Sequence, residues 1–440
     1  MKRFAGILVS FLAAVELLLQ VRAAAAQEVN AGGGRAAAMR SDQTPLGSPM
    51  FYPSPQHPLG WRGDGTGNYA GAQPATRWSD KLNVAWRTEV GEGHSSPVVV
   101  GDRVLITSEP DLLVCLDAAS GKVLWRKAQK IADLPAELHA EAPPPGPPSQ
   151  WAGYATPVPA SDGKSIWTVF GSGIVACYDL GGNRRWMSWY EARRSPNYGR
   201  TCSPVLVGAR LLVHFGPLLC LDAATGKLLW KNDKAKATYG TPAAARIGDT
   251  DVAVTPKGDL VRVADGKLLA SGLGSSFYPS PVIQGRIVYF IDHAITAVEL
   301  PAAVGDSIEP KELWSEDLAG EFYASPLIRT GRIYTVDRLA NYYVIDAASG
   351  KTLLTKALSL PSAGRGAGPS MYASICRAGD RLWVGNNAGE SLLLEPGEQA
   401  AVIATNALPE GADGTPAFSG PRMFVRGGKW LYCIASAGGS

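Results

Sequence analysis

The feature that most constrains the fold of this 440-residue chain is an internal repeat. A small residue, then Ser or Thr, then Pro recurs before a short apolar run, and each occurrence anchors one repeat. The anchors lie 38 to 60 residues apart, on average about 46, and they are Pro97, Pro157, Pro204, Pro242, Pro281, Pro326 and Pro416, with Ile375 in the one remaining place. A period of this size indicates a solenoid, a propeller or another repeat architecture.

Each repeat has the composition of four short strands. The run SPVVVGDRVLITSEPDLLVCLDAASGKVLWRK, residues 96–127, alternates β-branched and polar residues between turns that contain Gly, Asp and Pro. This alternation predicts strands, and four strands in 40–50 residues are typical of a β-propeller blade. The 50 Gly and 32 Pro residues are spread along the chain, which favours short strands and turns over long helices.

The two ends of the repeat region predict how the ring closes. Residues 414–435 supply only three strands, while LNVAWRTEVG, residues 82–91, has the fourth-strand pattern but precedes the first anchor. If this segment completes the last repeat, the ring has no open edge. We therefore predict an all-β fold: an eight-bladed β-propeller of four-stranded antiparallel blades, closed by an N-terminal strand. Seven blades is the alternative if the degenerate repeat at Ile375 forms none.

The residues before the propeller predict an exported protein. Lys2 and Arg3 precede an apolar stretch and the run Ala23–Ala26, which is the pattern of a signal peptide covering residues 1–26. Residues 27–81 are expected to form a flexible arm and lead-in, and residues 82–440 the propeller. We expect no transmembrane segment and, with no cysteine before Cys115, no lipid anchor, hence a periplasmic or secreted monomer. A net charge of +3 argues against nucleic-acid binding.

Two segments carry a resemblance to a known family. They are CLDAASGKVLW, residues 115–125, and CLDAATGKLLW, residues 220–230, with weaker copies at 178–186, 263–270 and 345–355. They resemble the tryptophan-docking repeats of the PQQ-like β-propellers, a group that includes quinoprotein dehydrogenases and the lipoprotein of the outer-membrane barrel-assembly machinery. The resemblance implies that Asp opens a turn, Gly adopts a positive φ in it, and Trp packs between blades. These structural residues are Asp117, Gly121, Trp125, Trp186, Asp222, Gly226, Trp230 and Trp314.

The resemblance also raises the question of a cofactor. Quinoprotein enzymes of the family carry a vicinal Cys–Cys pair above the quinone, and Glu, Asn and Asp around a calcium ion. None of the six cysteines here is adjacent to another, and the five histidines show no metal-ligand spacing. We predict no cofactor, no metal site and no catalytic residue, with PQQ and calcium as the alternative. Four of the cysteines occupy the same position in different repeats. Equivalent positions in neighbouring blades are expected to lie too far apart for a disulfide bond, so we expect none.

A second pattern in the anchors points to a ligand site. Three positions before each anchor stand His94, Tyr154, Thr201, Tyr239, Tyr278, Tyr323, Tyr372 and Asp413. In a propeller the first strand lines the channel, so these side chains are expected around one mouth. Two interpretations remain open. The tyrosines have a packing role inherited with the repeat, or they form an aromatic, hydrogen-bonding rim for a ligand.

Three long loops are expected on the same face, at residues 128–153, 187–200 and 357–371. They add Trp151, Trp189, Tyr190, Arg193, Arg194, Arg200 and Arg365 as possible contacts. The predicted ligand-binding residues are His94, Tyr154, Tyr239, Tyr278, Tyr323, Tyr372, Asp413 and Arg200. We predict a non-catalytic binding or scaffolding propeller whose partner is a protein, a glycan or a small molecule. The alternative is a PQQ-dependent oxidoreductase or a carbohydrate-active enzyme that uses the propeller mouth.

Overall fold

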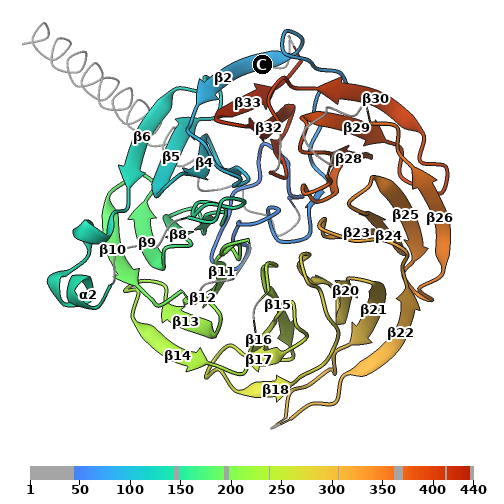
Figure 1. Ribbon diagram of the computed structural model, residues 1–440. Coiled ribbons are helices and arrows are strands. Elements are labelled where there is room, and N and C mark those ends of the chain that lie inside the picture. The colour runs from blue at the N-terminus through green and yellow to red at the C-terminus, as the bar shows by residue number, and fades with distance from the viewer. Residues whose placement is uncertain are drawn as a thin grey trace, which may run out of the picture. The chain divides into compact units, whose positions relative to one another are not determined.

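Eight antiparallel sheets surround a central channel, and each sheet is one blade of a β-propeller (Figure 1). The computed structural model describes residues 44–142, 148–192, 198–236, 238–305, 307–360, 370–411 and 414–436. The first strand of each blade lies nearest the channel and the fourth forms the outer rim (Figure 1). The predicted all-β, eight-bladed fold is therefore confirmed.

The strands follow the repeats in chain order. Blade 1 consists of β3(Val98–Val100), β4(Arg103–Ser108), β5(Leu112–Asp117) and β6(Val123–Ala128), and blade 2 of β7(Ala160–Ser161), β8(Ser165–Val169), β9(Ile174–Asp179) and β10(Arg184–Trp189). Blade 3 consists of β11(Val205–Val207), β12(Arg210–His214), β13(Leu218–Asp222) and β14(Leu228–Asn232), and blade 4 of β15(Ala243–Ile247), β16(Thr250–Val254), β17(Leu260–Arg262) and β18(Leu268–Ala270).

Blades 5 to 8 complete the ring. Blade 5 consists of β19(Val282–Gln284), β20(Ile287–Ile291), β21(Ala294–Glu299) and β22(Lys311–Asp317), and blade 6 of β23(Leu327–Arg329), β24(Arg332–Val336), β25(Asn341–Asp346) and β26(Thr352–Ala357). Blade 7 consists of β27(Cys376–Ala378), β28(Arg381–Gly385), β29(Glu390–Leu394) and β30(Val402–Ala407), and blade 8 of β31(Ala417–Ser419), β32(Arg422–Gly427), β33(Trp430–Ile434) and β2(Val84–Glu89).

The closing blade combines both ends of the repeat region. β2 pairs antiparallel with β33, so that Trp86 lies opposite Cys433 and Glu89 opposite Trp430. The expected closure by an N-terminal strand is confirmed. The degenerate repeat at Ile375 also forms a full blade, since Ile375 directly precedes β27.

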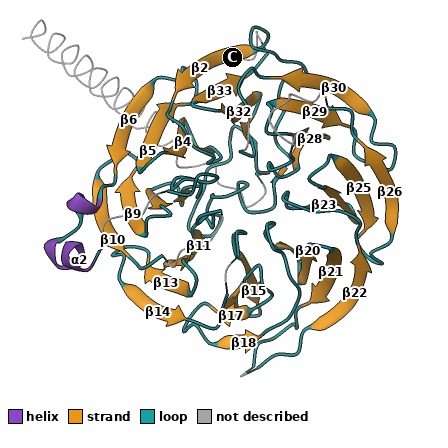
Figure 2. Ribbon diagram, viewed as in Figure 1, coloured by secondary structure: helices purple, strands orange, loops and turns teal. Residues whose placement is uncertain are grey.

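Burial follows the position of a strand within its blade. All five residues of β8 and of β29 are buried, because these middle strands are covered on both faces by neighbouring blades. The outer strand β6 alternates between half-buried and exposed residues, as expected for a strand with one solvated face. The helical turns η1(Ile131–Asp133) and α2(Ala136–Glu141) lie in the first long loop (Figure 2). Within the described ranges no helix has the length and apolarity needed to span a bilayer.

The six cysteines are all buried and all have free thiols. Cys115, Cys177, Cys220 and Cys433 occupy equivalent third strands of different blades. Burial raises the pKa of each thiol, so these side chains remain protonated and pack as small apolar groups.

Residues 45–80, here called the central segment, first occupy the channel (Figure 1, blue) and then leave it to contact the outer strand β30, where Asn406 Oδ1 accepts the backbone N–H of Trp78 at 2.9 Å. β1(Asn68–Tyr69) pairs parallel with β27 of blade 7, and the Tyr69 ring meets Phe418 of blade 8 edge-on at a centroid distance of 5.1 Å. Tyr52 donates its hydroxyl to the Gly163 carbonyl at 2.8 Å. Residues 27–81 were expected to form a flexible arm and lead-in. From Pro45 onward the structure instead has a packed chain that buries Leu46 and Leu59.

Arg62 fixes the central segment to the propeller. This side chain is only 2% exposed, and its guanidinium donates to the carbonyl oxygens of Pro326 at 3.0 Å and Ile375 at 2.7 Å. Burial lowers the pKa of Arg62 to about 10, which still leaves it charged at neutral pH. A Cβ at Gly67 would lie 2.6 Å from the guanidinium, so the close approach of the chain here requires glycine.

Candidate functional site

Seven aromatic side chains form a continuous row on the face where the first strands begin. We call this face the arc face and the row the aromatic arc, which consists of Trp151, Tyr198, Tyr239, Phe277, Tyr278, Tyr323 and Tyr372. Each residue lies in the loop before the first strand of its blade, from blade 2 to blade 7. The repeat positions four members at an equivalent place in blades 4 to 7, namely Tyr239, Tyr278, Tyr323 and Tyr372.

Neighbouring rings contact one another across blade boundaries. Tyr372 stacks on Tyr323 with ring centroids 5.0 Å apart and planes 8° apart, and Tyr323 meets Tyr278 edge-on at 4.5 Å. Tyr278 stacks on Tyr239 at 5.4 Å, and Phe277 meets Tyr239 edge-on at 5.5 Å. Stacked and edge-on arrangements at these separations are the favourable ones for aromatic pairs. The predicted residues Tyr239, Tyr278, Tyr323 and Tyr372 are thus brought together.

The arc extends beyond the tyrosines that the repeat register identifies. Tyr198 meets Tyr239 edge-on at 5.5 Å, and Trp151 lies 6.5 Å from Tyr198. Four members are strongly exposed: Trp151 at 60%, Tyr372 at 46%, Phe277 at 39% and Tyr198 at 38%. Packing between blades explains the contacts among the rings but not this exposure, and contiguous exposed apolar surface marks an interaction site.

A carboxylate and a guanidinium lie beside the centre of the arc. Tyr323 donates its hydroxyl to Glu321 Oε1 at 3.3 Å, and Arg338 Nε donates to Glu321 Oε2 at 2.9 Å. Partial burial, followed by the influence of Tyr198 and Glu321, raises the pKa of Tyr278 to about 12. Partial burial and Glu321 also raise the pKa of Tyr323. Both phenols are therefore neutral at physiological pH, and the proton of Tyr323 is the one donated to Glu321.

The remaining predicted ligand residues are placed elsewhere. His94 is half-buried and lies before β3, near Glu109. Burial raises the pKa of Glu109, whereas the backbone N–H of Tyr154 and the charge of His94 both act to lower it. Tyr154 donates that N–H to Glu109 at 2.9 Å. Tyr154 and Arg200 both face Gly171, since a Cβ there would lie 3.5 Å from Tyr154 Cδ1 and 3.6 Å from Arg200 Cβ. Outside the described residues lie Asp413, Arg193, Arg194 and Arg365.

A circle of hydrogen bonds explains the Ser or Thr of the anchor. Its hydroxyl oxygen accepts the backbone N–H of the equivalent residue in the preceding blade: Ser280 Oγ accepts from Thr241 at 2.8 Å, and Ser325 Oγ from Ser280 at 2.9 Å. The same bond joins Ser203 to Thr241, Ser325 to Ser374, Ser374 to Thr415 and Thr415 to Ser96. In blade 2 the Thr156 hydroxyl bonds to Ala152, and Val158 donates to Ser203 instead. The repeated hydroxyl was the signal in the sequence, but periodicity alone does not identify its partner.

Replacing Ser280 by alanine is expected to lower the free energy of unfolding by about 2 kcal/mol, because the buried N–H of Thr241 loses its acceptor. Urea unfolding followed by tryptophan fluorescence measures the change. The control is Ser271→Ala, at an exposed serine just after β18, with an expected change within about 0.5 kcal/mol. Equal effects of the two substitutions would contradict a stabilising role for the hydroxyl circle.

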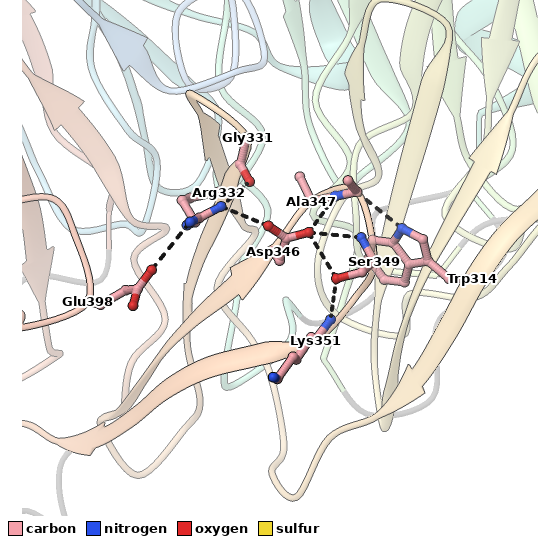
Figure 3. A network of polar contacts seen from close by, with 9 residues as sticks. Trp314, Gly331, Arg332, Asp346, Ala347, Ser349, Lys351 and Glu398 are labelled. Carbon is pink, nitrogen blue, oxygen red and sulfur yellow. Dashed lines mark hydrogen bonds and ion pairs between the residues drawn. The ribbon is translucent and has the colours of Figure 1, made fainter.

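The tryptophan-docking residues form joints between blades (Figure 3). Trp314 of blade 5 donates its indole N–H to the Ala347 carbonyl of blade 6 at 3.2 Å. The Asp346 carboxylate accepts from the Ser349 backbone at 3.0 Å and from its hydroxyl at 2.9 Å, which shapes the turn. Arg332 then bonds to Asp346 at 2.8 Å and to Glu398 of blade 7 at 3.3 Å.

The same joint recurs around the ring. The indole N–H groups of Trp86, Trp125, Trp186 and Trp230 donate to the carbonyls of Ala118, Leu180, Ala223 and Val263 in the next blade. Asp117 and Asp222 hold the turns through Ser120 and Thr225, and Gly121 and Gly226 have φ of +70° and +74°. These turns join third to fourth strands, so the antiparallel order places them on the face opposite the arc. They are structural and do not line the candidate site.

The channel itself contains a cavity of about 710 Å³, here called the half-channel. One wall is the central segment around Trp61, and the other consists of the first strands of blades 3 to 5, β11, β15 and β19. The cavity extends along β15 from Thr241 and Pro242 at the arc-face end to Arg246 at the opposite end. It provides a concave space directly below the arc.

The fold and the repeats together define an eight-bladed β-propeller whose tryptophan-docking turns resemble those of the PQQ-like propellers. A family model described as outer membrane protein assembly factor BamB matches residues 70–137 and 171–308. These ranges include both of the clear tryptophan-docking segments. The resemblance to the PQQ-like propeller repeats is confirmed.

Two curated proteins are similar over part of this chain. A polyvinylalcohol dehydrogenase from Sphingopyxis sp. (strain 113P3) is 28% identical over 215 residues, which is 43% of this chain and 31% of that protein. A polyvinylalcohol dehydrogenase from Pseudomonas sp. is 27% identical over 259 residues, which is 54% of this chain and 36% of that protein. The aligned part thus spans about a third of the length of either relative.

Solved structures share the fold at low sequence identity. The crystal structure of BamB from Moraxella catarrhalis has a TM-score of 0.58 and 12% identity, covering 80% of this chain and 99% of that chain. A europium-containing methanol dehydrogenase has a TM-score of 0.55 and 14% identity, covering 82% of this chain and 88% of that chain. These likenesses establish the architecture alone.

The residues that the structure describes do not fit the PQQ–calcium site that the resemblance implies. Among them no group of three or more His, Cys, Asp or Glu side chains gathers to hold a metal ion. On the arc face, Glu321 is engaged by Arg338 and Glu109 by backbone N–H groups. The six thiols are buried in or beside strands and form no vicinal pair. We therefore derive no chemical step through a quinone.

Proposed function

We propose that this chain is an exported binding propeller that holds a linear polyhydroxylated polymer along the aromatic arc. The observation that carries the proposal is the unbroken row of partly exposed rings on the arc face. A flat series of contacts across six blades suits an extended ligand better than a compact one. The arc is long and open, whereas small-molecule sites are concave.

The chemistry of the arc matches that of a polymer with hydroxyl groups. The ring faces of Tyr and Trp offer apolar area for the C–H faces of such a chain, and the phenol groups hydrogen-bond to its hydroxyls. The neutral phenol of Tyr278 retains its proton, whereas Tyr323 donates its proton to Glu321 and offers a ligand its hydroxyl oxygen as an acceptor. Glu321 and Arg338 neutralise each other beside Tyr323, while the Lys257 ammonium lies 5.3 Å from the centroid of the Phe277 ring. One such cation beside seven rings leaves the surface mainly aromatic, which suits a ligand that is itself neutral.

The relatives support the same ligand class. Both curated matches are named for polyvinyl alcohol, a linear chain that bears hydroxyl groups. Polyvinyl alcohol and neutral linear glycans share this chemistry, and the experiment has to distinguish them. Both relatives are also named as dehydrogenases, which supports the alternative of an oxidoreductase, whereas the groups around the arc do not.

The proposal is tested by electrophoresis of the native protein in gels that contain polyvinyl alcohol, a soluble linear glucan, or no polymer. We expect at least one polymer to retard the protein. The polymer that does so shows whether the ligand is polyvinyl alcohol or a glycan. Unchanged mobility in both gels would overturn the proposal and favour a protein partner for the arc face. Incubation with PQQ and calcium, followed by desalting, tests the alternative, for which a retained cofactor absorbance band would be the supporting result.

A further inference from the structure

The central segment covers only part of the channel wall. It pairs with blade 7 through β1 and with blade 2 through Leu59 and Ser161, and Gln73 donates to Gly420 of blade 8. Arg62 extends its contacts to blade 6. The first strands β11, β15 and β19 of blades 3 to 5 face the half-channel instead. The channel is therefore filled on one side and hollow on the other.

The hollow side lies below the centre of the aromatic arc. Tyr239 and Tyr278 precede the first strands of blades 4 and 5, two of the three blades that line the half-channel. Thr241 and Pro281, which follow them by two and three residues, line its arc-face end. A ligand on the arc consequently lies next to the upper end of this cavity.

The lining suits a neutral group that presents both C–H faces and hydroxyls. On the blade side it is formed by small apolar side chains, among them Val205 and the three alanines Ala243–Ala245. The central segment contributes the indole of Trp61 and the carboxylate of Asp64, which accepts the Thr66 hydroxyl and is an acceptor for hydroxyl groups. Arg246 at the far end is paired with Asp251 at 3.4 Å, so its charge is balanced. The volume of about 710 Å³ lies within the range of small-ligand sites, roughly 300–1,000 Å³.

We propose that the half-channel binds one end of the polyhydroxylated chain whose following units lie on the aromatic arc. This inference rests on the proposed function and specifies how the polymer is recognised. A polymer that enters the cavity at an internal unit would have to place two polymer segments in it side by side, whereas a polymer end places only one. The site would thus distinguish chain ends from chain interiors, which the flat arc alone does not do.

End recognition has a signature in the dependence of binding on chain length. Polyvinyl alcohol and a linear glucan are each cut into fractions of graded length, and binding to the intact protein is measured by titration calorimetry. If ends are bound, half-saturation occurs at a constant molar concentration of chains. If only interiors are bound, it occurs at a constant mass concentration of polymer. The second result would overturn the inference while leaving the proposed function intact.

Filling the cavity gives an independent test. Ala244 is exposed toward the half-channel from β15, so Ala244→Phe occupies the space without disturbing the buried core. We expect about tenfold weaker binding of short chains, equivalent to roughly 1.4 kcal/mol, and a change to the mass-concentration dependence. The control Ala224→Phe, at an exposed alanine in the β13–β14 turn, should bind as the unaltered protein does. Unchanged binding of short chains by Ala244→Phe would contradict end recognition. Absence of binding by the unaltered protein would overturn the proposed function as well.

Discussion

Replacing Tyr239 and Tyr323 together by alanine is expected to weaken polymer binding about a hundredfold. Each ring contributes apolar contact and stacking, and a loss of about 1.4 kcal/mol at each position gives this factor. The two residues are separated by Tyr278 in the row, so their removal divides the arc into short pieces. Titration calorimetry with the polymer that retards the native protein measures the loss.

The matched control keeps the rings and removes the hydroxyls. Tyr239→Phe combined with Tyr323→Phe should retain most of the affinity if stacking dominates. The melting temperature separates binding from packing, since both rings are only half-buried and the alanine variant should melt close to the unaltered protein. A large fall in melting temperature, with proportionate loss of binding, would instead support a purely structural role for the tyrosines.

The second large effect is expected at a tryptophan-docking joint. Gly226→Ala should lower the free energy of unfolding by about 4 kcal/mol, the sum of a residue held at positive φ and a steric overlap. Gly226 has φ +74°, and an added Cβ would lie 2.4 Å from the Trp186 ring. The ring cannot move aside easily, because its indole N–H is bonded to the Ala223 carbonyl, which also accepts from Trp167. Urea unfolding measures the difference.

Gly208 provides the control for backbone strain. Its φ is +57°, but an added Cβ would meet nothing within 4 Å. Gly208→Ala should therefore cost only the conformational part, about 1 kcal/mol. The difference between the two alanine variants isolates the contact with Trp186. If both variants lose the same stability, the contact with the docked tryptophan contributes nothing.

The sequence predicted the fold well because the repeat supplies many independent copies of the same information. The anchor prolines located seven of the eight first strands and Ile375 the eighth, and the lone strand with Trp86 predicted the closing blade. The same register aligned Tyr239, Tyr278, Tyr323 and Tyr372, which the structure brings into contact. Periodicity predicts such features because equivalent residues occupy equivalent places.

Features outside the repeat could not be predicted in this way. Phe277 and Tyr198 join the arc through loops whose course has no counterpart in other blades. The polar region between Leu46 and Tyr69 has the composition of a flexible arm, yet it packs because the channel surrounds it with apolar wall on several sides. The role of Arg62 depends on two carbonyl groups far away in the sequence.

The closing blade has a consequence for how the protein reaches its folded state. Arg87 of β2 contacts Tyr432 of β33, and these residues are 345 positions apart. A chain that emerges with its N-terminus first holds β2 without its partner β33 until the last blade is made, and the central segment without its partners in blades 6 to 8. Contacts between such distant segments are slow to form because a long loop must close first. The time between synthesis and closure is therefore the period in which the unfinished ring exposes a strand edge and is most open to misassembly or to capture by a chaperone.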